Sequence, residues 1–127
     1  MQKTNRALFE RWLDALGKAW INRDPRAAAN LCAKSVLYFE TPFGNPLKSR
    51  AEVEKVWDEI PNSHKNIEFT YEVLTISENL CIAHWTASFT RILSGKRETW
   101  DGIYSVKLNE NGLCSEFHQW WVIKPKS

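Results

Sequence analysis

The hydrophobic positions of the chain change their period near its middle. In the first half they recur at spacings of three and four residues, which is typical of amphipathic helices. One such stripe starts at Leu8 and continues to Trp20. We therefore expect a helix that ends near Asn22, with Thr4 as a candidate N-cap. Asp24 followed by Pro25 predicts the N-cap and first turn of a short second helix.

A strand, a loop and a third helix follow. Residues 36–40 are β-branched and aromatic, which predicts a short strand. Residues 41–46 contain two prolines and a glycine, so we expect an irregular loop there. Ser49 and Glu52 have the spacing of a capping box, and an apolar stripe runs from there to Ile60. Pro61 is expected to end this helix.

The second half of the chain shows the two-residue alternation of β-strands. We expect four long strands at residues 67–76, 80–93, 97–108 and 113–123, joined by hairpin-length turns. Strands of this length would outreach the helices available to cover them if the sheet were flat. The sheet should therefore curl around the helices into an open cone with a hollow interior.

Alternation also sorts side chains into two faces, because residues two apart on a strand share a face. The inner face is predicted to carry Phe69, Tyr71, Val73, Cys81, Ala83, Trp85, Ala87, Phe89, Trp100, Gly102, Tyr104, Phe117, Gln119 and Trp121. The outer face is predicted to carry Glu68, Thr70, Glu72, Ile82, His84, Asp101, Ile103, Glu116, His118, Trp120 and Val122. The apolar members of the outer face would be exposed on a monomer. We therefore expect a symmetric homodimer through Ile82, His84, Ile103, His118 and Trp120; the alternative is that these residues are scattered and harmless.

Composition narrows the class of protein. The chain has 127 residues and a formal charge of +2, with no run of basic residues, so we expect one domain and no nucleic-acid partner. No apolar run approaches the length of a membrane span, and the N-terminus lacks the apolar core of a secretory signal. The three cysteines are widely spaced, which favours buried thiols, no metal or cofactor site, and a cytoplasmic location.

Polar residues on a predicted apolar inner face are the candidates for chemistry. Tyr104 and Gln119 are two such residues, and each would otherwise make a satisfied hydrogen bond in the core. Glu40 ends the first strand, where burial would raise its pKa and suit it to acid–base work; alternatively it points to solvent or pairs with an arginine. His84 and His118 fall on the outer face, while His64 falls in a polar turn where we expect no specific role.

Two segments carry a resemblance to known proteins. The stretch from Glu40 to Pro46 resembles the strand-to-loop segment of ketosteroid isomerases. Residues 111–121 resemble the closing strand of polyketide-cyclase-like (SnoaL-like) proteins. With the order of elements, the whole chain is similar to the nuclear-transport-factor-2-like superfamily. That resemblance implies a single domain over residues 1–127 with an α+β, cystatin-like cone, in which three N-terminal helices pack on a strongly curved, mixed, mostly antiparallel sheet.

The resemblance implies isomerase, hydrolase, dehydratase, cyclase or non-catalytic binding activity, and the catalytic residues of these groups are changed here. The ketosteroid isomerase base aligns with Thr41, one residue after Glu40. Their acid on the third long strand corresponds to Tyr104, and the first helix has no tyrosine. Gln119 occupies the position of the carboxylic acid found on the closing strand of related enzymes.

Two functional hypotheses follow. The first is a small-molecule-binding protein for an apolar or planar ligand, with Glu40, Tyr104 and Gln119 as candidate catalytic residues. Its pocket walls would be Trp12, Trp20, Tyr38, Phe39, Trp57, Trp85, Phe89, Trp100, Phe117 and Trp121. The second hypothesis is a non-catalytic protein-interaction module, since tryptophan and tyrosine are also frequent in interface hot spots.

Overall fold

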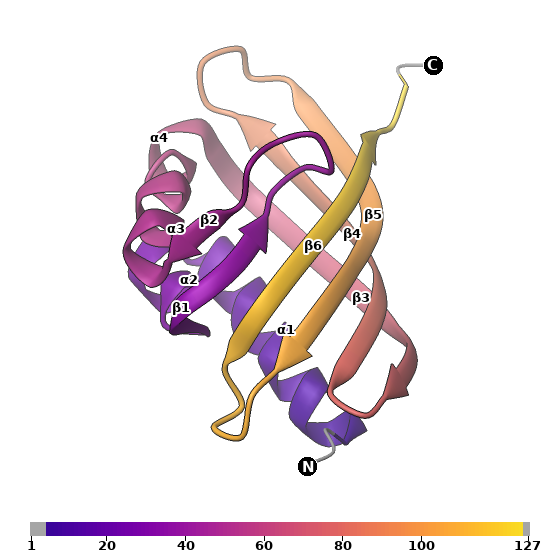
Figure 1. Ribbon diagram of the computed structural model, residues 1–127. Coiled ribbons are helices and arrows are strands. Elements are labelled where there is room, and N and C mark those ends of the chain that lie inside the picture. Colours follow the sequence, from indigo (N-terminus) through magenta and orange to yellow (C-terminus); the bar gives the residue numbers. More distant parts are fainter. Residues whose placement is uncertain (1–4, 126–127) are drawn as a thin grey trace.

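Helix α1 (Arg6–Ile21) lies against the concave face of a six-stranded sheet in the computed structural model, which describes residues 5–125 (Figure 1). Helices α2 (Pro25–Ala29), α3 (Arg50–Trp57) and the single turn α4 (Ile60–Ser63) flank one end of the sheet. The strands are β1 (Cys32–Phe39), β2 (Leu47–Ser49), β3 (His64–Ser77), β4 (Leu80–Arg91), β5 (Arg97–Leu108) and β6 (Cys114–Ile123).

The helix starts follow local capping chemistry. Asn5, rather than Thr4, caps α1, because its side-chain oxygen accepts a hydrogen bond from the Leu8 backbone N–H at 2.8 Å; Thr4 lies outside the described residues. Asp24 caps α2 as predicted. The Ser49 and Glu52 capping box at the start of α3 is also confirmed.

The end of the third helix differs from the prediction. Helix α3 ends at Trp57, not at Ile60, and Asp58 is its C-cap. Pro61 does not terminate it but lies within the first turn of α4. A proline is tolerated at that position because the backbone N–H it lacks would have no partner inside the helix. The junction between α3 and α4 places Glu59 and Ile60 beside the inner face of the sheet.

The sheet has the strand order β2-β1-β6-β5-β4-β3. Only β1 and β6 pair in parallel, and the remaining neighbours are antiparallel. The predicted α+β cone with a mixed, mostly antiparallel sheet is therefore confirmed. The short strand β2 was not predicted, since three residues between a loop and a helix carry too little pattern to be recognised.

The predicted division of the long strands into two faces is confirmed by the register. Trp85 pairs with Tyr71 on one side and Gly102 on the other, and Tyr104 pairs with Ala83 and Gln119. Residues paired in this way project from the same face of a sheet. The inner face packs on α1, where Gly17 lies so close to Phe69 that a side chain there would overlap the Phe69 ring. All three cysteines are buried as free thiols.

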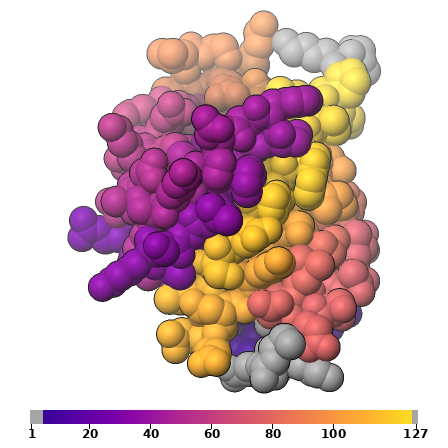
Figure 2. Space-filling view, viewed as in Figure 1, coloured from indigo at the N-terminus to yellow at the C-terminus, as the bar shows by residue number. Residues whose placement is uncertain are grey.

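The outer face is polar with apolar interruptions, and Figure 2 shows it with β6 in yellow crossing beside the β1–β2 segment. His84 bridges Glu72 and Asp101 with contacts of 3.1 and 2.9 Å. His118 lies 2.9 Å from Glu116 and belongs to a separate group. Among the described residues no cluster is arranged to hold a metal ion, and no helix is long and apolar enough to span a membrane.

Candidate functional site

A cavity of about 230 Å³ lies between the inner face of the sheet and the segment formed by α3 and α4. The sheet contributes aromatic and polar side chains from β1, β3, β4, β5 and β6, and the helical segment closes the opposite side. The lining residues are Trp20, Tyr38, Glu40, Val56, Trp57, Glu59, Ile60, Ser63, His64, Trp85, Arg91, Trp100, Tyr104 and Gln119.

Half of the predicted wall residues line this cavity, namely Trp20, Tyr38, Trp57, Trp85 and Trp100. Trp12, Phe89 and Phe117 do not, because they are buried in the core beneath it. Trp12 donates its indole N–H to the Leu31 carbonyl at 3.0 Å, and Phe117 stacks on Tyr38 with ring centroids 4.3 Å apart.

Two further wall assignments need correction. Phe39 points to the outer face, where its ring stacks on His118 at a centroid distance of 4.4 Å. Neighbouring residues on a strand face opposite sides, so Tyr38 and Phe39 cannot both line the interior. Trp121 stacks on Trp100 at 4.3 Å but is not among the residues that line the cavity.

Two carboxyl groups line one side of the cavity. Glu40, half-buried just after β1, lies on the same face as Tyr38, and Glu59 lies between α3 and α4. Burial raises the pKa of Glu40, and the negative charge of Glu59 raises that pKa further. Glu40 makes no salt bridge among the described residues. A raised pKa makes such a carboxyl group a stronger base toward a ligand.

Two hydrogen-bond donors beside the cavity have no partner in the part of the chain that the structure describes. The Tyr104 hydroxyl makes no hydrogen bond, and burial raises its pKa well above the ordinary value, so it is a neutral donor. The Trp85 indole N–H is fully enclosed and also lacks an acceptor. The two rings stack with centroids 4.9 Å apart. An unsatisfied buried donor such as the Trp85 N–H costs about 1 to 3 kcal/mol, whereas the Tyr104 hydroxyl faces the cavity and can donate to a ligand oxygen.

Gln119 makes a satisfied hydrogen bond, which was the alternative to a catalytic role. Its side-chain nitrogen donates to the backbone carbonyl of Glu40 at 2.8 Å. This hydrogen bond fixes the end of β1 to β6 at the point where Glu40 enters the cavity. Gln119 therefore lines the cavity and holds the Glu40 backbone in place. The sequence predicted the inner face for Gln119, but it left the direction of Glu40 open and did not predict this contact.

The cavity lining includes ionisable residues that were not predicted as site residues, namely Glu59, Arg91 and His64. His64 differs most from its expected place. It lies at the start of β3 rather than in a turn, and it is 7% exposed. Its Nδ1 accepts a hydrogen bond from the Trp20 indole N–H at 3.1 Å, and its ring stacks on Phe89 at 3.7 Å. Burial, with a smaller effect from Arg91, lowers the pKa of His64 to about 4. His64 is consequently a neutral imidazole in the wall of the cavity.

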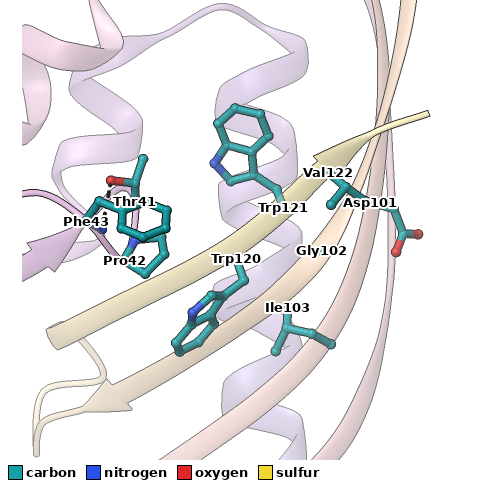
Figure 3. Close-up of a pocket in the computed structure, with 9 residues that line it drawn as sticks. All are labelled: Thr41, Pro42, Phe43, Asp101, Gly102, Ile103, Trp120, Trp121 and Val122. Atoms are coloured by element: carbon teal, nitrogen blue, oxygen red, sulfur yellow. Dashed lines mark hydrogen bonds between the residues drawn. The ribbon is translucent and has the colours of Figure 1, made fainter. Parts of the chain in front are cut away.

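A second, larger hollow lies outside the cone. It measures about 610 Å³ and is an open groove between the loop at Thr41–Phe43 and the outer parts of β5 and β6 (Figure 3). Figure 3 shows Trp120 and Trp121 projecting to opposite sides of β6. Among residues 5–125, Asp101 is the only ionisable residue in the lining, so this part of the chain offers the groove no acid–base pair. The inner cavity is therefore the candidate functional site.

The sequence matches the profile of the SnoaL-like domain over residues 9–117. This chain belongs to the SnoaL-like family. No curated protein matches the sequence. This family is of the nuclear-transport-factor-2-like type, and one fold of this kind can carry different activities.

Solved structures show the same fold as this SnoaL-like domain. A Bacillus subtilis protein provisionally assigned as an isomerase is 16% identical, with a TM-score of 0.79 over 94% of this chain and 90% of its own. A Novosphingobium aromaticivorans protein provisionally assigned as a scytalone dehydratase is 12% identical, with a TM-score of 0.78 over 95% and 87%. A Δ5-3-ketosteroid isomerase from Mycobacterium sp. is 13% identical, with a TM-score of 0.75 over 92% and 98%. At these identities the likeness establishes the fold alone.

Proposed function

We propose that this SnoaL-like domain binds a small, planar, largely apolar carbonyl compound in its inner cavity and catalyses proton transfer next to the carbonyl group. The observation that carries this proposal is the unpartnered Tyr104 hydroxyl in the same cavity as the Glu40 carboxyl, whose pKa is raised. Aromatic walls favour a flat ligand, because stacked rings bury a large apolar area at little cost in side-chain entropy.

Glu40 is the proton acceptor in this proposal. Its carboxylate removes a proton from the carbon next to the carbonyl group, and the electron pair of the broken C–H bond moves to the carbonyl oxygen. Tyr104 donates a hydrogen bond to that oxygen as its negative charge develops. Return of the proton from Glu40 to a different carbon completes an isomerisation, and departure of a leaving group from the neighbouring carbon would complete an elimination instead.

Gln119 and Glu59 act on Glu40 rather than on the ligand. The hydrogen bond from Gln119 fixes the backbone of Glu40, which positions the carboxyl group. Burial raises the pKa of Glu40, and the negative charge of Glu59 raises it further. A carboxylate with a raised pKa is a stronger base, so this effect favours proton abstraction by Glu40. The structural neighbours include a ketosteroid isomerase and a protein provisionally assigned as a scytalone dehydratase, and both names denote reactions of this class.

The test is deuterium exchange, which needs no knowledge of the natural substrate. A panel of planar ketones, including indanone and tetralone, is incubated with the protein in D2O, and exchange of the hydrogens beside the carbonyl group is followed by NMR. The wild type should accelerate exchange, and Glu40→Gln should lose that acceleration. Tyr71→Phe is the matched control for Tyr104→Phe, because Tyr71 bonds to Asp14 outside the cavity. An exchange rate that is equal in wild type and Glu40→Gln would refute the proposal.

A further inference from the structure

The guanidinium group of Arg91 is held rigidly beside the cavity, and one of its three nitrogens, Nη1, does not bond to Glu98. Its Nε and Nη2 both donate to the Glu98 carboxylate at 3.1 Å, in a bidentate pair. The guanidinium carbon also lies 5.1 Å from the centre of the Phe89 ring and 5.9 Å from that of Trp100. Glu98 is itself fixed, since it accepts a hydrogen bond from the Trp100 indole at 2.9 Å. These contacts fix the direction of the remaining nitrogen, Nη1.

Nη1 faces a second donor. Nε2 of His64 lies 3.5 Å from it. Nδ1 of His64 accepts the indole N–H of Trp20, which can only donate, so the proton of the neutral imidazole is on Nε2. Two N–H groups therefore face each other with no acceptor between them among residues 5–125. Both residues line the inner cavity.

We propose that Arg91 Nη1 and His64 Nε2 together bind a carboxylate oxygen of the ligand, so that the substrate class is an aromatic keto acid. This inference rests on the proposed function and adds the second polar group of the ligand. A single oxygen can accept from both nitrogens, since donors 3.5 Å apart leave room for an acceptor about 2.9 Å from each. A carboxylate is favoured over a neutral oxygen because its bond to a guanidinium is charge-assisted.

The distribution of charge in the cavity orients such a ligand. The pKa of Glu40 responds to Glu59, whereas the pKa of His64 responds to Arg91 and Glu98. The cavity thus has an acidic side and a side that offers N–H donors. A carboxylate would be repelled by Glu40 and Glu59 and held at Arg91. The ketone end would then lie toward Tyr104 and Glu40, where proton transfer is proposed.

The experiment compares acids with their uncharged amides. Benzoate, naphthoate and anthracene carboxylate, each paired with the corresponding amide, are titrated into the protein near neutral pH by isothermal calorimetry. At least one acid should bind about tenfold more tightly than its amide, the difference expected for a charge-assisted hydrogen bond. Arg91→Gln combined with Glu98→Gln should abolish that preference without leaving an unpaired buried charge. Far-UV circular dichroism and thermal unfolding establish that this variant is folded.

Arg97→Gln is the control, because it removes the same charge from a neighbouring strand position outside the cavity. Arg97 pairs with Glu68, which does not line the cavity, so the preference for the acid should persist in this variant. Acids and amides that bind the wild type equally well would overturn the carboxylate site and leave the proposed function standing. A preference for the acid that persists when Arg91→Gln and Glu98→Gln are combined would likewise overturn the carboxylate site and leave the proposed function standing. Failure of every acid and amide to bind would overturn both.

Discussion

The indole N–H of Trp20 donates to Nδ1 of His64 across 3.1 Å, and this contact links α1 to the first residue of β3. This contact fixes the tautomer of the buried neutral His64, with its proton on Nε2. One wall of the cavity therefore presents an N–H donor. Protonation of His64 would cost a great deal in the folded state, because the ring is buried beside Arg91. The stability of the fold should therefore depend on pH.

We predict that the free energy of unfolding falls as the pH decreases from about 6.5 to about 4, the ordinary and the folded pKa of His64. The unfolded chain binds a proton in this range and the folded protein does not, so acid favours unfolding. The loss should reach up to about 3 kcal/mol at the lower end. Urea unfolding at several pH values measures it. His64→Gln should remove most of this dependence.

His84→Gln gives the opposite sign and serves as the comparison. Hydrogen bonds that His84 donates to the carboxylates of Asp101 and then Glu72 raise the pKa of His84. A raised pKa in the folded state contributes stability at acidic pH that is lost as the pH rises, so removing His84 should make the acid-induced loss steeper. A wild-type stability that does not change over this pH range would contradict the assignment of His64 as a neutral buried group.

Tyr104→Phe and Tyr71→Phe should have opposite consequences. The Tyr104 hydroxyl has no partner among the described residues, so its removal should leave the free energy of unfolding unchanged or slightly higher. The affinity for a carbonyl ligand should fall about tenfold. Tyr71 bonds to Asp14 at 2.7 Å, and its loss should cost about 1 kcal/mol of stability with no change in affinity. Calorimetry and urea unfolding of both variants test the pair, and a large loss of stability in Tyr104→Phe would show that its hydroxyl has a structural partner.

Glu59→Gln should lower the pKa of Glu40 without restoring it to the ordinary value. Burial is the larger cause of the raised pKa and stays in place, while the smaller effect of the Glu59 charge disappears. Carbon NMR titration of the side-chain carboxyl groups measures the change directly. Glu54→Gln removes an equal charge from α3 at a residue that does not line the cavity, and should leave the pKa of Glu40 where it is.

Gly102→Ala should destabilise the fold by about 3 kcal/mol or more. A Cβ at Gly102 would overlap the backbone carbonyl oxygen of Trp120, and neither strand can move without disrupting the sheet. Gly44→Ala is the matched control: its added Cβ would lie 3.7 Å from Thr41 Oγ1, an ordinary contact. Thermal or urea unfolding should show a change within about 0.5 kcal/mol for Gly44→Ala. Similar stability of the two variants would mean that β5 and β6 are further apart than the structure has them.

A homodimer through the outer face of the sheet stays a prediction. Trp120 and Val122 on that face are 45% and 67% exposed, and burying them would favour association. Sedimentation at tens of micromolar should show a dimer for the wild type and a monomer for Trp120→Glu. Leu93→Glu is the control, since Leu93 is 99% exposed but follows β4 in the turn before β5. A wild type that sediments only as a monomer would refute the dimer.

The sequence alone was sufficient to predict the curled sheet and the face of each long strand. Alternation over ten or more residues leaves only one register that buries Trp85, Tyr104 and Gln119 together, because a slip of one residue would expose the whole apolar row. The capping residues Asp24 and Ser49 were equally recognisable, since capping depends on neighbouring backbone groups. Phe39 was misplaced because strand alternation was not applied across Tyr38 and Phe39.

The tertiary structure determined which side chains of those faces meet in the cavity. His64 escaped prediction because the pairing of β3 with β4 shifts between Lys65 and Glu68, where Asn66 adopts a positive φ of 52°. Such an irregularity breaks the alternation, so the side chain of His64 turns into the core against the pattern of the strand. The facing donors of Arg91 and His64, and the charge of Glu59 beside Glu40, likewise join residues far apart in the chain. Local sequence pattern carries no information about such contacts, since they exist only once the cone has closed.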